Sequence, residues 1–123
     1  MKKIIALFVC CFTLFCLLGC DVATGTWKFH SKTAEVWGFS KTFNIGDKDL
    51  IGNDITEDYL VVIFNKDGTG TLTQSYADVN LTFTWVEEDD VIKVTGQLVS
   101  FDAKIEDGYL IFDYIGETYK LKK

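Results

Sequence analysis

A succession of short apolar segments, separated by polar turns, most constrains the fold of this chain. Residues 80–86 alternate strictly, so that Leu81, Phe83 and Trp85 share one face of an extended segment and threonines lie between them. Such alternation indicates a strand that buries one face, because successive side chains of a strand point to opposite sides. Asp-Gly pairs at residues 67–68 and 107–108 favour tight hairpins. The chain is therefore predicted to be all-β.

About seven or eight strands are predicted, near residues 27–30, 59–65, 72–75, 80–86, 91–95, 99–105, 109–115 and 117–121. The regular spacing of the turns predicts an antiparallel up-and-down meander, closed as a barrel or folded as a sandwich. Residues 31–58 interrupt this regularity. Their first part fits one or two strands, and their second part fits an acidic surface loop. A long excursion of this kind in a compact β domain is often functional.

The N-terminus forms a separate unit. Lys2 and Lys3 precede an apolar run over residues 4–18, which has the length of a secretory signal helix and falls short of the roughly 20 residues that span a bilayer. The run ends in LLGC at residues 17–20, which resembles the bacterial lipobox. This resemblance implies cleavage after Gly19 and acylation of the Cys20 thiol. A plain signal peptide or an uncleaved membrane helix is the alternative.

The lipobox resemblance divides the chain into a signal peptide at residues 1–19, a short tether at 20–25 and a single domain at 26–123. It also implies attachment by lipid to the non-cytoplasmic side of a bacterial membrane, whether inner or outer. All cysteines lie at or before the expected cleavage site, at positions 10, 11, 16 and 20. The mature domain is therefore expected to lack a disulfide, and its stability must come from the apolar core.

Charge argues against several classes of partner. Loss of Lys2 and Lys3 leaves 10 of the 12 basic residues against 18 acidic ones, a net charge of −8 for the mature chain. Such a domain repels nucleic acid and anionic lipid headgroups, so neither is expected as a direct ligand. All basic residues are lysine, so the bidentate recognition of phosphate by arginine is not available.

A second resemblance covers most of the mature chain. Gly25 and Trp27, in GTWKF at the start of the meander, resemble the opening of lipocalins, in which the tryptophan closes one end of an eight-stranded barrel. In that family an arginine near the last strand packs across the tryptophan; here Lys120 or Lys122 is expected to take its place. The resemblance implies an interior that binds a small hydrophobic molecule. The interior candidates are Phe83, Trp85, Phe101, Phe112 and Tyr114, which line a pocket or fill a dry core.

Catalytic and metal sites are not expected. The single histidine, His30, lies at the end of a predicted strand, and no serine has the context of a nucleophile elbow. Asp47, Asp49, Gly52 and Asp58 fit four positions of a calcium-loop template, but Ile51 stands where an oxygen ligand is required. The chain is therefore predicted to be a binding protein without catalytic activity, cofactor or metal.

Two functions fit this prediction. The first is binding of a small hydrophobic molecule inside the barrel. The alternative is an interaction, structural or surface-antigen role in the cell envelope, with a filled barrel and a contact patch around Trp37 and Phe39.

The lipobox prediction is tested by replacing the cysteine that would be acylated. The full-length chain, produced in a bacterial host, is expected to sediment with membranes, because several acyl chains give a stable anchor. The Cys20→Ala variant should leave the membrane fraction, whereas Cys16→Ala, whose preceding Phe15 does not fit the cleavage pocket, should stay there. Membrane partitioning by Cys20→Ala would contradict the lipid anchor.

Overall fold

The computed structural model describes residues 23–123, so the predicted signal peptide, Gly19 and Cys20 lie outside the described residues. These residues form nine strands and no helix. The strands are β1 (Gly25–Val36), β2 (Phe39–Asn44), β3 (Val61–Phe64), β4 (Thr69–Gln74), β5 (Val79–Glu88), β6 (Val91–Thr95), β7 (Ser100–Glu106), β8 (Tyr109–Tyr114) and β9 (Glu117–Lys122). None of the elements in this part of the chain is a helix that could cross a bilayer.

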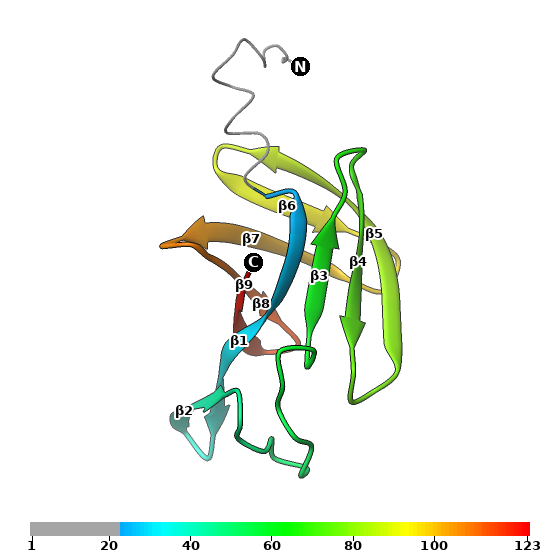
Figure 1. Ribbon diagram of the computed structural model, residues 1–123. Helices are drawn as coiled ribbons and strands as arrows, with labels where there is room; N and C mark the ends of the chain where they lie inside the picture. Colours follow the sequence, from blue (N-terminus) through cyan, green and yellow to red (C-terminus); the bar gives the residue numbers. More distant parts are fainter. Residues whose placement is uncertain (1–22) are drawn as a thin grey trace.

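Eight of the strands close into an antiparallel barrel. From β3 to β9 each strand pairs with the next, β3 also pairs with β1, and β1 pairs with β9 to close the ring (Figure 1). The all-β meander predicted from the sequence is confirmed, and it is a barrel and not a sandwich. The Asp-Gly turns occur as expected, between β3 and β4 and between β7 and β8.

The first strand is the longest and has three partners. Its start, Gly25–Lys28, pairs with β3, its middle pairs with β9, and its end, Ser31–Val36, pairs with β2. The predicted strand at residues 27–30 therefore continues to Val36, and residues 39–44 add the ninth strand as a hairpin that extends beyond the barrel (Figure 1). The remainder of the 31–58 segment is a loop, as predicted.

A β-bulge interrupts the pairing of β1 with β9. Phe29 lies opposite Leu121 and Lys32 opposite Tyr119, so that three steps along β1 match two steps along β9. The extra residue reverses which side chains point inward. Trp27 and Phe29 face the core before the bulge, and Lys32 and Ala34 are buried after it.

Large side chains fill the barrel interior. The rings of Phe101 and Phe112 stack at 4.2 Å between centroids, and Phe112 lies over Tyr119 at 5.7 Å. On the opposite wall the ring of Phe83 packs against Gly70, where an added Cβ would come within 2.4 Å of the ring. The largest fully buried side chains are Trp27, Tyr59, Tyr119, Phe29, Phe43, Phe64, Ile55, Leu60, Leu72, Ile92, Leu110 and Leu121.

Candidate functional site

The bulge in β1 places a lysine inside the barrel, at the end next to the loop between β2 and β3. We call this end the loop end. The Lys32 side chain is only 7 % exposed, and it lies where β1, β2 and β9 meet. A charged ammonium group loses its hydration on burial, so it must find replacement partners within the protein. The surroundings of Lys32 supply both hydrogen bonds and aromatic rings.

Three oxygens and three rings surround the Lys32 ammonium. Nζ donates hydrogen bonds to the Tyr59 hydroxyl at 3.0 Å and to the two carboxylate oxygens of Glu117, Oε1 at 3.2 Å and Oε2 at 3.4 Å. It lies 5.0 Å from the ring centroid of Tyr59, 5.4 Å from that of Phe43 and 5.9 Å from that of Tyr119. Ring faces at these distances attract a cation, and the attraction strengthens when water is excluded. The rings therefore offset part of the lost hydration.

The same cluster holds the loop between β2 and β3. The Tyr59 hydroxyl donates to Asp49 Oδ2 at 2.9 Å, and Asp49 also accepts hydrogen bonds from the backbone N–H groups of Ile51 and Asn53. Burial alone would raise the pKa of Asp49, but the hydrogen bonds from Asn53, Tyr59 and Ile51 outweigh it and lower this pKa below its ordinary value. The ionised carboxylate therefore fastens the loop to the end of the barrel.

The tyrosines of this cluster act as neutral donors. Burial, and then the hydrogen bond to Asp49, raises the pKa of Tyr59 far above its ordinary value. Burial, followed by the nearby charge of Glu117, does the same to the pKa of Tyr119, whose hydroxyl donates to Glu117 Oε1 at 3.0 Å. The ring of Tyr76 stacks on Tyr59 at 4.4 Å. Together these contacts lock the side chains in place.

The polar cluster is internally satisfied. Among residues 23–123, every buried side-chain nitrogen and oxygen has a hydrogen-bond partner. Lys32 thus occupies the aromatic cage that an external cation would need, and Glu117 and Asp49 already accept from groups of the chain. The arrangement closes the loop end of the barrel and attaches the loop to it.

The predicted barrel-closing residues lie near the opposite end of β1. Trp27 is buried, and its indole N–H donates to the carbonyl of Ala23 at 2.8 Å. The lysine over its ring is Lys123, with Nζ at 5.2 Å from the centroid. Lys120, one of the two lysines expected there, lies over Tyr109 instead. Gly25 adopts a φ of 130°, which favours glycine, at the point where β1 begins.

The five interior candidates make two sets of ring contacts within one apolar cluster. Phe83 and Trp85 both pack on Phe64, with centroids 5.7 and 5.1 Å away, and Trp85 is only partly buried. Phe101 and Phe112 are buried in the second set, where Tyr114 packs on Phe101 from the edge at 6.4 Å. Both sets consist of rings in mutual contact. Phe83, Phe101 and Phe112 belong to one buried apolar cluster, and Trp85 and Tyr114 pack against it.

Apolar side chains are exposed on two projections near the loop end. Trp37, in the turn between β1 and β2, is 92 % exposed, and Ile51, in the following loop, is 81 % exposed. Phe39 and Leu50 are also exposed. We call these four residues the apolar tip. The hairpin and loop that carry it lie at the end of the domain away from the start of β1 (Figure 1). The sequence predicted a contact patch around Trp37 and Phe39 only. The neighbouring apolar residues Leu50 and Ile51, in an otherwise acidic loop, are the sequence signal that could have indicated the rest of the patch.

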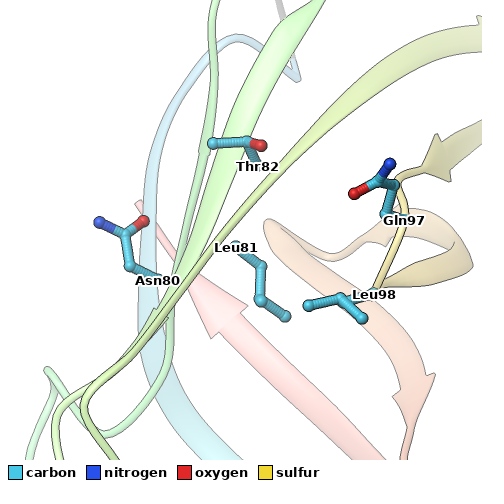
Figure 2. A pocket seen from close by; sticks show the side chains of 5 residues that line it. All are labelled: Asn80, Leu81, Thr82, Gln97 and Leu98. Carbon is cyan, nitrogen blue, oxygen red and sulfur yellow. The ribbon is translucent and has the colours of Figure 1, made fainter.

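A shallow depression also lies between β5 and the turn after β6. Asn80, Leu81, Thr82, Gln97 and Leu98 line it, and Leu98 lies beside Leu81 although it is largely exposed (Figure 2). These lining residues include no charged side chain, no cysteine and no histidine. The depression therefore offers little chemistry for catalysis or anion recognition.

The residues of the calcium-loop template have other partners. Asp47 accepts the backbone N–H of Asn44 at 2.8 Å, Asp49 belongs to the Tyr59 cluster, and Asp58 lies 3.9 Å from Lys28. Within the described part of the chain, no three metal-ligating side chains are grouped. His30 Nδ1 lies 3.2 Å from the Ser31 hydroxyl, and its ring rests on Tyr109.

No family model, curated protein or solved structure matches the chain.

The coupling between Lys32 and Glu117 is a measurable property of this cluster. Glu117→Gln removes the carboxylate while Lys32 stays buried, and we expect it to lower the free energy of unfolding by about 1–3 kcal/mol, less than for a fully buried pair because Glu117 is 25 % exposed. In a Lys32→Met background the same substitution should cost much less. Urea denaturation of the four proteins measures the coupling. Equal losses in both backgrounds would show that the two charges are not coupled.

Proposed function

We propose that this chain is a lipid-anchored, non-catalytic binding module of a bacterial cell envelope, which contacts a partner protein through the apolar tip. The observation that carries this proposal is the 92 % exposure of Trp37, in the turn between β1 and β2. This hairpin lies at the end of the domain away from the start of β1 (Figure 1). Tryptophan is among the residues that most often dominate the energy of protein interfaces. An apolar ring stabilises a fold only when it is buried, so the exposed Trp37 ring adds nothing to the stability of this domain.

The surroundings of Trp37 support an interface. Phe39, Leu50 and Ile51 add apolar surface on the same end, and charged residues such as Glu35 and Lys41 are exposed beside them. An apolar centre with a polar rim is the usual composition of a protein interface.

The expected anchor is compatible with this orientation. Cys20 precedes the buried Ala23 by three residues, a reach of at most about 10 Å. In the proposal, acyl chains on Cys20 hold the N-terminal side of the barrel close to a membrane, and the apolar tip points away from that membrane. The module would then present the tip to a partner across the periplasm or at the cell surface.

We favour this surface over the interior pocket that the lipocalin resemblance implies. Rings in mutual contact occupy interior positions on both walls, including Phe64, Phe83, Phe112 and Tyr119. The buried polar groups near Lys32 are paired with one another, which supports a structural and not a catalytic role for them. A small hydrophobic ligand would have to displace these side chains.

The proposal predicts that one exposed ring controls partner capture. The tagged full-length chain, extracted in mild detergent from its own envelope, should retain a partner protein, and Trp37→Ala should weaken retention by at least about 30-fold, as for an interface hot spot. Leu98→Ala is the matched control, because Leu98 is 78 % exposed but lies in the turn between β6 and β7. Both variants should keep the wild-type melting temperature. Equal capture by the wild type and Trp37→Ala would refute the proposed contact surface.

A further inference from the structure

Strand β2 is an open edge of the sheet. It stands last in the strand order and pairs with β1 alone among residues 23–123. Strand β3 leaves β1 at Lys28, before the paired region of β2 begins at Ser31, so it does not cover β2. All residues of β2 except Phe43 are exposed. Natural proteins usually cover or shorten such an edge, because its unpaired backbone groups can pair with another chain.

The turn before β2 determines which of its backbone groups are free. Trp37 and Gly38 have φ values of 55° and 84°, as in a two-residue hairpin turn with both central residues left-handed. In such a hairpin the flanking residues, Val36 and Phe39, exchange backbone hydrogen bonds, and every second pair after them does the same. Lys41 and Phe43 therefore bond to β1, and the backbones of Ser40, Thr42 and Asn44 point away from it.

The bonds of Asn44 agree with this assignment. Its N–H donates to Asp47 Oδ2 at 2.8 Å, and its carbonyl accepts from the Asp47 N–H at 3.0 Å, so both groups point away from β1. Ser40 and Thr42 share the orientation of Asn44, but no residue of the described chain bonds to their outward N–H and C=O groups. Four backbone groups at two-residue spacing thus remain on the edge.

The lysine of β2 does not block this edge. Lysine in an edge strand commonly discourages pairing with other chains. Lys41 is the lysine at the centre of β2, but its Nζ lies 5.3 Å from the ring centroid of Phe43, two residues further along the same strand. The outward groups of Ser40 and Thr42 are therefore accessible.

We propose that β2 accepts an extended, basic segment of a partner protein as an added strand, hydrogen-bonded to Ser40 and Thr42. This inference deepens the proposed function and rests on it, since Trp37 and Phe39 adjoin the same edge. Only another extended chain offers donors and acceptors at the matching two-residue spacing. Charge selects the partner: the chain has a net charge of −6, so a second copy is repelled and a basic segment is attracted.

The first test uses a defined probe and the full chain in detergent micelles. The probe is the blocked peptide KTVTVTK, and amide hydrogen exchange is followed by NMR. Without peptide, the amides of Ser40 and Thr42 should exchange at least about tenfold faster than those of Lys41 and Phe43, because only the latter are bonded to β1. Saturating peptide should slow exchange at Ser40 and Thr42. Unchanged exchange at millimolar peptide would overturn the proposal.

Matched variants distinguish strand addition from other contacts. Thr42→Pro removes the outward N–H and should abolish peptide binding, whereas Thr42→Val keeps the N–H and should bind like the wild type. Protected Lys41 and Phe43 amides would show that the hairpin of the proline variant is intact. Independently of any protein variant, methylation of the central peptide nitrogen should weaken binding about tenfold, and the acidic peptide ETVTVTE should bind more weakly than KTVTVTK at low salt. Equal binding of the matched proteins or of the matched peptides would overturn the proposal.

Two further outcomes separate this inference from its alternatives. Protection of Ser40 and Thr42 that rises with protein concentration in the absence of peptide would assign the edge to a second copy and overturn the basic partner. In the capture experiment, loss by Trp37→Ala with full retention by Thr42→Pro would leave the proposed function intact and exclude strand addition. Retention by Trp37→Ala combined with loss by Thr42→Pro would refute the contact surface at the apolar tip but keep the edge.

Discussion

The β-bulge between Phe29 and Ser31 determines which side chains of β1 enter the barrel. Strand β1 must serve three neighbours, and the bulge lets it do so by changing which residues face the core midway along the strand. A regular strand that buries Phe29 would continue inward with Ser31 and Thr33, and Lys32 would point to solvent. With the bulge, Lys32 turns inward opposite Tyr119 and Phe43.

Burial of Lys32 links the barrel to its loop and shapes the function that the domain can perform. A buried ion pair contributes little net stability compared with apolar residues of the same size, but it fixes one arrangement of its partners. Here the arrangement runs from Glu117 through Lys32 and Tyr59 to Asp49 in the loop. The loop end of the barrel is thereby closed, which leaves the outer edge of β2 and the apolar tip as the surfaces best suited to recognition.

Local patterns were sufficient to predict the antiparallel meander, but not its closure as a barrel or the polar cluster at one end of it. Strict alternation around Phe83 and the Asp-Gly turns identified the hairpins, because both are properties of neighbouring residues. The bulge erased alternation after Phe29, so the sequence predicted one or two strands in the first part of residues 31–58 but not that β1 continues without a break to Val36. Burial of Lys32 depends on Glu117, 85 residues away, and nothing local indicates such a contact. Likewise, the lysine over Trp27 is the terminal Lys123, a choice that only strand register decides.

The main consequence of the bulge is that the Lys32 ammonium lies among three rings inside the barrel. The most direct measurement is the NMR chemical shift of the Lys32 side-chain methylene protons in the unmodified protein. Because Nζ lies 5.0 Å from the ring centroid of Tyr59, 5.4 Å from that of Phe43 and 5.9 Å from that of Tyr119, we expect the methylene protons next to it to resonate clearly upfield of those of exposed lysines such as Lys48. Cross-peaks from these protons to the three rings are also expected. Lys32 shifts equal to those of exposed lysines, without such cross-peaks, would show that the bulge does not hold this side chain among the rings.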